Sequence, residues 1–276
     1  MRINQNIAAF NSYRNLSNTQ NQLGSSLEKL SSGFRINRAA DDAAGLTKSE
    51  GLRAEIRGTN QAVRNAQDGI SLVQTAEGAL NEVHSILQRM RELAVDAANT
   101  ATTDGVAQQA EVTELLAELT AIGTRTEFSG QQVFNGAART FQVGANTGDT
   151  MTVTISNLAA GGVGNLDALG AAGSTDVSAL DVSTAAPAAI TTLDAAIASV
   201  SSERSSLGAK QNRLEHTIAN LQVASENLSA SESRIRDTDM AQEMVQFTRN
   251  QIMQQAGTAM LAQANQAPQS VLSLLR

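Results

Sequence analysis

The chain has 276 residues, enough for one large domain or two ordinary ones, but only 3% are aromatic and Trp is absent. A compact globule of this length normally fills its centre with more large side chains, so the composition favours long helices packed side by side. The net charge of −7 argues against a nucleic-acid partner, which requires a concentrated basic face. The lack of Cys excludes disulfides and thiolate metal sites, and the apolar runs are too short to cross a bilayer.

Three helices are predicted in the amino-terminal half of the chain. Large apolar side chains recur at three- and four-residue steps over about residues 3–33, and after a break they recur over about 46–99. From Val83 onward the second of these helices is apolar on two faces, so we expect two neighbours there. One neighbour is a third helix, expected at about 104–125, with Thr102-Thr103-Asp104 as its cap.

A β-hairpin is predicted at residues 140–155, where apolar and polar side chains alternate on both sides of a turn. The apolar positions of this hairpin are Phe141, Val143, Met151 and Val153. The stretch that follows, 157–186, is rich in Gly, Ala, Ser and Thr and has little periodicity. We expect it to form a short surface excursion rather than a domain.

The strongest periodic signal begins after Pro187, which suits the first turn of a helix. Alternate steps of three and four residues from Ile190 to Ile235 fall on Ile, Leu or Val at ten of fourteen positions, which is typical of a coiled-coil seam. A last helix is predicted after Asp239, whose side chain should cap it, and Pro268 is expected to interrupt it.

The two ends of the chain carry almost no charge. Only Arg2 and Arg14 are charged within residues 1–27, and only Arg249 within 244–275, while Asn and Gln are abundant in both segments. Because a buried charge costs several kcal/mol whereas a buried amide can be satisfied by hydrogen bonds, this pattern indicates burial against other copies of the chain. The simpler alternative is a soluble helical hairpin within one molecule, but such a hairpin would keep a charged outer face.

Each end by itself is a thin amphipathic helix, so we expect the ends to be loose in the free subunit and to fold on assembly. The large apolar residues of both ends are the candidates for core assembly contacts: Ile3, Ile7, Phe10, Leu23, Leu27, Leu30, Met244, Phe247, Ile252, Met260, Leu261, Leu272 and Leu275.

Several motifs resemble those of bacterial flagellins. They are Leu30-Ser-Ser-Gly-Phe-Arg-Ile-Asn37 with Asp41-Asp-Ala-Ala-Gly45, Gln88-Arg-Met-Arg-Glu-Leu-Ala-Val95, and the tail from Gln254 to Arg276. The resemblance covers everything except about 157–186, where thirty residues replace the large outer domains of many family members. It implies a mainly α fold, a long antiparallel helical rod or coiled-coil bundle built from both chain ends with one β-hairpin.

The resemblance also implies a division into domains and a function. Residues 1–40 with 238–276 would form an inner core domain lining the export channel, and 41–237 a rod domain. The protein would polymerise into the extracellular flagellar filament, the propeller for swimming. A supercoiled filament needs two subunit packings, and we expect the hairpin to be the bistable element.

The partners that the resemblance implies are other copies of the chain, the flagellar export chaperone and type III export apparatus, the cap and hook-associated proteins, and a host Toll-like receptor. The receptor motif maps onto Arg89, Leu93 and Glu111, a surface that we also interpret as an inter-subunit contact. The amino end lacks the apolar stretch of a signal peptide, so we expect export without a cleaved one. Some flagellins are O-glycosylated, for which Ser and Thr within 173–192 are candidates.

No pattern of catalytic, metal or cofactor residues is found in the sequence. His84 and His216 lie far apart, and neither belongs to a zinc-protease motif. We therefore expect no enzyme activity, no cofactor and no metal. Two other functions stay open: a hook–filament junction protein of the same superfamily, and a secreted coiled-coil adaptor or effector.

Overall fold

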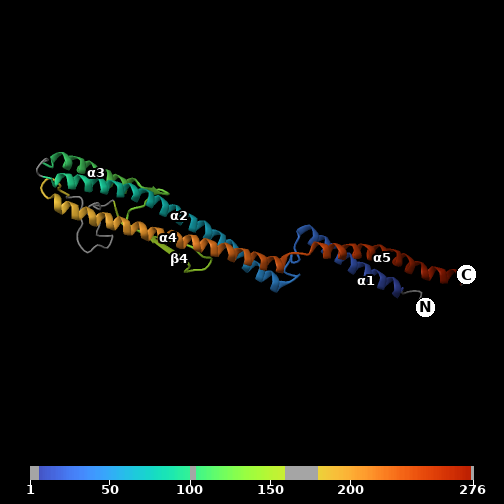
Figure 1. Ribbon diagram of the computed structural model, residues 1–276. Helices are drawn as coiled ribbons and strands as arrows, with labels where there is room; N and C mark the ends of the chain where they lie inside the picture. The colour runs from blue at the N-terminus through green and yellow to red at the C-terminus, as the bar shows by residue number, and fades with distance from the viewer. Residues whose placement is uncertain (1–5, 100–103, 159–179, 275–276) are drawn as a thin grey trace. The chain divides into compact units, whose positions relative to one another are not determined.

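The computed structural model describes the backbone of residues 6–99, 104–158 and 180–274, and the side chains among these up to residue 266. Within this range the chain is mainly helical, with two small antiparallel sheets (Figure 1). The elements are α1 (Ile7–Ser32), α2 (Ala43–Ala97), α3 (Val106–Arg125), β1 (Glu127–Phe128), β2 (Gln131–Gln132), β3 (Ala138–Gln142), β4 (Thr150–Thr154), α4 (Ala186–Arg236) and α5 (Met240–Leu274).

The chain forms two compact units. The end unit comprises Met1–Glu55 and Glu226–Arg276, and the middle unit comprises Ile56–Ser225. Helices α2 and α4 contribute residues to both units. The inner core domain expected from the sequence, 1–40 with 238–276, falls entirely inside the end unit.

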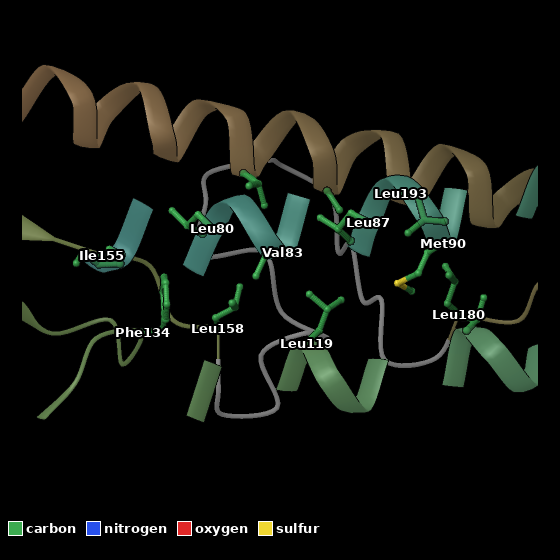
Figure 2. Close-up of a cluster of buried hydrophobic side chains, with 14 of the residues drawn as sticks. Leu80, Val83, Leu87, Met90, Leu119, Phe134, Ile155, Leu158, Leu180 and Leu193 are labelled. Atoms are coloured by element: carbon green, nitrogen blue, oxygen red, sulfur yellow. The ribbon is translucent and has the colours of Figure 1, made fainter. Parts of the chain in front are cut away.

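The core of the middle unit lies between α2, α3 and α4. Figure 2 shows Leu80, Val83, Leu87 and Met90 of α2 between Leu119 of α3 and Leu193 of α4. The two apolar faces predicted for α2 therefore have the two neighbours that they require. Buried Ala residues within α2 leave room for close packing, which explains how a chain with so few aromatic residues fills its core: Ala66, Ala76, Ala94 and Ala97.

The predicted seam of α4 is confirmed, because none of its fourteen positions is exposed. Every second seam position is buried up to Leu214, namely Leu193, Val200, Leu207 and Leu214. The positions between them, and all seam positions from Ile218 onward, are half-buried. Two of the polar seam positions have partners across from them on α2: Arg204 lies 3.9 Å from Glu77, and Ser225 donates to Asn60 at 3.3 Å. These contacts fix the register of α4 against α2.

The predicted hairpin is confirmed as β3 and β4, which pair antiparallel with Phe141 opposite Met151 and Arg139 opposite Val153. A second, smaller hairpin, β1–β2, was not expected. It turns through Ser129 and Gly130, whose φ angles are +53° and +72°. Two strands of two residues each have no periodicity that a sequence pattern could reveal.

The start of α3 agrees in part with the expected cap. Thr102 and Thr103 lie outside the described residues, and Asp104 accepts a hydrogen bond from the Val106 amide at 3.3 Å. Gly105, which directly precedes the helix, adopts a φ of +72°. A side chain there would be strained and would also meet the backbone of Ser183 at 2.8 Å.

The two ends of the expected surface excursion differ from the expectation, and the expected interruption of the last helix is corrected. Residues 159–179 of the expected surface excursion lie outside the described range, but Leu158, Leu180 and Val182 at its two ends are buried in the core of the middle unit (Figure 2). They belong to the same cluster of buried side chains as the apolar residues of α2, α3 and α4. Helix α5 also continues through Pro268, because a single proline removes one hydrogen bond and can be accommodated without ending the helix.

Candidate assembly surface

Helices α1 and α5 lie side by side in the end unit (Figure 1) and meet along a seam with a seven-residue repeat. Its positions are Ala9, Ser12, Leu16, Thr19, Leu23, Ser26 and Leu30 on α1, and Glu243, Phe247, Asn250, Gln254, Gly257, Leu261 and Ala264 on α5, none of which is exposed. We call these residues the α1/α5 seam. Small and polar residues alternate with large apolar ones along it, so the pairing is weaker than that of an all-Leu seam.

The most deeply buried positions of the α1/α5 seam are polar, namely Ser26 and Asn250. The large apolar seam residues are only half-buried. At Gly257 the seam is tight, because a Cβ there would stand 3.2 Å from Cδ1 of Leu16. At its far end the Asn6 side-chain amide donates to the carbonyl of Ala264 at 2.7 Å.

The outer faces of both helices carry large apolar side chains that stay exposed in the single chain. On α1 these are Ile7, Phe10, Tyr13 and Leu27, and on α5 they are Met240, Met244, Val245, Ile252, Met253 and Met260. Met244, Val245, Ile252 and Met253 line a shallow apolar groove beside Arg249. Because the exposed residues of α5 lie on several sides of the helix, α5 needs neighbours in addition to α1.

The candidate core assembly residues therefore separate into two groups. Leu23, Leu30, Phe247 and Leu261 face the α1/α5 seam within one chain, whereas Ile7, Phe10, Leu27, Met244, Ile252 and Met260 point outward. Ile3 and Leu275 lie outside the described residues, and Leu272 belongs to the part of α5 whose side chains are not described. The large apolar residues expected to form one stripe on the first helix therefore lie on two different faces. The rest of the seam on α1 is formed largely by Ala, Ser and Thr, which the apolar pattern does not include.

A junction that was not expected from the sequence ties the two helices together where they meet the rest of the end unit. Phe34 and Asp237 form an isolated antiparallel β-bridge, the Arg35 amide donates to the Arg236 carbonyl at 2.6 Å, and the Thr238 amide donates to the Gly33 carbonyl at 2.9 Å. Gly33 ends α1 with a φ of +75°. We call residues 33–35 and 236–238 the junction clasp.

The side chain of Arg236 reinforces the junction clasp. Its guanidinium lies 4.8 Å from the centre of the Phe34 ring, and its Nη1 lies 3.0 Å from a carboxylate oxygen of Glu50. The side chain of Arg236 is only 13% exposed, so the pair with Glu50 is partly desolvated. Close by, the buried Ser49 hydroxyl donates to Glu232 at 3.0 Å.

Hydrogen bonds to two carboxylates shape the loop between α1 and α2. Asp42 accepts from the Gly45 amide at 2.8 Å and so caps α2. Asp41 accepts instead from the amides of Arg38, at 2.9 Å, and Asn37, at 3.1 Å, which lowers the pKa of Asp41. Both nitrogens of the Arg38 fork bond to Glu28, which ties this loop back to α1.

Arg89, Leu93 and Glu111, the proposed receptor and contact motif, lie together in the middle unit. Arg89 Nε on α2 donates to Glu111 on α3 at 2.9 Å, and its Nη1 lies 3.2 Å from Glu92. The hydrogen bond that Arg89 donates to Glu111 is the largest cause of the raised pKa of Arg89. Leu93 is only 7% exposed and packs in the core, so the accessible surface of the motif is formed by the ion pair.

The β3–β4 hairpin is held against both long helices of the middle unit. Met151 packs with Ala66 of α2 and Leu214 of α4, and the Val153 side chain is fully buried. Phe141 and Val143 are half-buried against the same core. The side-chain amide of Asn65 donates to the Gln142 backbone carbonyl at 3.0 Å, and Lys210 Nζ donates to the Thr154 backbone carbonyl at 3.1 Å. A movement of the hairpin would therefore change contacts to α2 and α4 together.

Among the described residues, no group of three or more His, Cys, Asp or Glu side chains is placed to hold a metal ion. Over the same part of the chain, no helix has the length and apolarity needed to cross a membrane. His84, in α2, contacts the side chain of Gln88, one turn further along the same helix, with 2.9 Å between the two Nε2 atoms.

Comparisons with known proteins give a consistent result. Residues 3–139 match a family model described as the bacterial flagellin N-terminal helical region, and residues 190–275 match one described as the bacterial flagellin C-terminal helical region. The chain is 49% identical to a flagellin of Bacillus subtilis and 52% identical to a flagellin of Halalkalibacterium halodurans, in each case over the full length of both chains. A putative flagellar hook-associated protein of Vibrio parahaemolyticus shares the fold, with a TM-score of 0.57 at 16% identity over 71% of this chain and all of that one.

Proposed function

The chain belongs to the bacterial flagellins, the structural subunits that polymerise into the extracellular flagellar filament for swimming, and we propose that the outward faces of α1 and α5 are the surfaces on which its copies join. The observation that carries this proposal is the exposure of large apolar side chains along two helices that carry almost no charge. Such a surface is costly in water and becomes favourable when other copies cover it.

A substitution at Ile252 tests the proposal, because this side chain is 61% exposed in the single chain. Ile252→Asp should leave the unfolding of the middle unit unchanged and abolish growth of long tubes from filament seeds, seen by electron microscopy. Ile252→Leu, which keeps the side chain apolar at similar volume, should still support growth. Growth of Ile252→Asp at the rate of Ile252→Leu would exclude this face from the subunit contact.

We also propose that the ends become ordered during assembly. The α1/α5 seam supports this, because its most deeply buried positions are Ser26 and Asn250 and its large apolar residues are half-buried in the single chain. Ordering the backbone costs about 1–2 kcal/mol per residue, which such a seam offsets poorly without further neighbours. Hydrogen exchange on the free subunit should be fast in α1 and α5 and slow in the core of the middle unit. Strong amide protection at both ends would contradict the proposal.

The ion pair between Arg89 and Glu111 is proposed as a second contact surface, between subunits and toward a host Toll-like receptor. Both side chains are exposed, and they lie above the buried Leu93. Arg89→Glu should weaken receptor activation and filament growth. The exchange Arg89→Glu with Glu111→Arg restores the pair but reverses its direction, so recovery by the double variant would show that the pair acts only within the chain.

The β3–β4 hairpin is proposed as the element whose two packings allow a supercoiled filament. Its contacts to both α2 and α4, through Met151, Gln142 and Thr154, support this role. Phe141→Leu or Val153→Ala should change the waveform of filaments seen by dark-field microscopy. Unchanged waveforms in both variants would remove the hairpin from this role.

The remaining partners follow as proposals from family membership: the flagellar export chaperone, the type III export apparatus, and the cap and hook-associated proteins. We propose that the chain is exported unfolded, and that residues 1–40 with 238–276 form the inner core lining the channel. The apolar sides of α5 favour a chaperone on this helix before assembly. A chain shortened to end before Met240 should no longer copurify with the chaperone.

A further inference from the structure

The methionines of this chain are divided sharply between the interior and the surface. Met90 and Met151, in the middle unit, are 0% and 5% exposed. Among the described residues, every exposed methionine lies in α5: Met240 at 48%, Met244 at 49%, Met253 at 37% and Met260 at 62%. Filling gaps in a core explains buried methionines. It does not explain why the exposed methionines are concentrated on α5.

The four exposed methionines flank the α1/α5 seam on both sides. Met240 and Met244 are four residues apart and share one side of α5, while Met253 and Met260 are seven residues apart and share another. None of them is a seam position, so each thioether is open to solvent while α1 and α5 stay paired. The chain has no Cys, so thioethers are the only sulfur atoms that an oxidant meets.

We propose that Met240, Met244, Met253 and Met260 form an oxidation site through which peroxide controls whether a free subunit can join a filament. The inference rests on the assembly surface proposed above. In the reaction, the sulfur lone pair attacks one oxygen of hydrogen peroxide, the O–O bond breaks and that oxygen stays on sulfur as a sulfoxide. Its proton passes to the departing hydroxide, which leaves as water. Sulfur is oxidised by two electrons and the peroxide is reduced by two.

A sulfoxide on α5 would oppose assembly because it turns an apolar contact into a polar one. The sulfoxide oxygen is a strong hydrogen-bond acceptor, and burying it against the apolar face of another copy without a donor is unfavourable. Once a subunit is in the filament, the same methionines would be covered and protected. The modification would therefore act on subunits that have not yet assembled, and methionine sulfoxide reductases would reverse it.

The test uses the full-length purified subunit and hydrogen peroxide. Peptide mass analysis of treated subunits should find sulfoxide at the four α5 methionines and none at Met90 or Met151. Seeded polymerisation should fall roughly tenfold or more, and treatment with the two sulfoxide reductases, one for each epimer, should restore it. Full polymerisation despite complete oxidation of α5 would overturn the inference, as would a loss that the reductases do not reverse.

Variants locate the effect. A chain with Met→Leu at all four α5 positions should keep its rate after peroxide, relative to its own untreated sample, so that any change in basal growth cancels. If that chain assembles poorly, the pairs Met240→Leu with Met244→Leu and Met253→Leu with Met260→Leu should each keep part of the resistance. A quadruple variant as sensitive as the parent would refute the site. Finally, α5 methionines that oxidise as fast in filaments as in free subunits would overturn the proposed assembly surface, and this inference with it.

Discussion

Phe10 allows a quantitative separation of subunit stability from assembly. Its side chain is 71% exposed in the single chain. A phenylalanine side chain presents on the order of 200 Å², so about 140 Å² is available for burial against another copy. At about 25 cal/mol per Å², complete burial contributes roughly 3.5 kcal/mol, and replacement by Ala should lose about 2–3 kcal/mol of it. Because 1.4 kcal/mol is a factor of ten, the critical concentration for polymerisation should rise roughly 30- to 150-fold in Phe10→Ala.

The same substitution should hardly affect the free subunit, where only a minor part of the ring is covered. Leu214→Ala is the matched control, because Leu214 is fully buried beneath the β3–β4 hairpin. We expect it to lower the free energy of unfolding of the middle unit by about 2–5 kcal/mol. Sedimentation of filaments at increasing subunit concentration gives the critical concentration, and urea unfolding followed by circular dichroism gives subunit stability. The reasoning fails if Phe10→Ala destabilises the subunit as much as Leu214→Ala, or if it moves the critical concentration less than about threefold.

Three further outcomes are expected. Ser129→Asn should stabilise the middle unit by roughly 0.5–1 kcal/mol in urea unfolding, because Asn tolerates the positive φ at this turn position better than Ser; Ser129→Val should do the opposite. Arg236→Gln should lower the stability of the junction clasp by about 1–3 kcal/mol in hydrogen exchange, and the exposed Arg234→Gln by less than about 0.5 kcal/mol. Hydrogen bonds from Ser183 and Thr184 lower the pKa of Asp181 to about 2. Its contribution to the turn at residues 181–184, which precedes α4, is therefore complete above its unfolded pKa of about 3.9 and lost as pH falls toward 2, which NMR of Thr184 would follow.

Much of the fold was predictable because its signals are periodic. The seam of α4 repeats over fourteen positions and the β3–β4 hairpin alternates about a turn, and each pattern has one structural solution. The α1/α5 seam was not identified as such, because Ala, Ser, Thr, Asn and Gln at its positions look like surface residues. Phe10 and Leu23 were therefore predicted to lie on one apolar stripe, although Phe10 points outward and Leu23 faces α5.

Contacts between distant segments explain the other differences. The junction clasp depends on main-chain pairing between Phe34 and Asp237, and backbone hydrogen bonds of a single bridge leave no mark in the side-chain pattern. Leu158 and Val182 flank a Gly- and Ala-rich stretch in the sequence, which predicted a surface segment. Their burial comes from packing against α2, α3 and α4, which are distant in the sequence. Glu111 could be placed beside Arg89 only through resemblance, since they come from different helices.

The junction clasp changes the effective distance between the two chain ends. Asn6 and Ala264 are 258 residues apart along the chain. Asn6 nevertheless caps α1 and Ala264 lies on α5, and the bridge between Phe34 and Asp237 joins the end of α1 to the start of α5. Once that bridge has formed, each further turn of α1 is separated from its partner turn of α5 by only a short loop. The entropic cost of pairing each successive turn is therefore small. Pairing of α1 with α5 can then advance turn by turn from Gly33 toward the chain ends. The outermost turns of the two helices should be the last to pair and the first to separate.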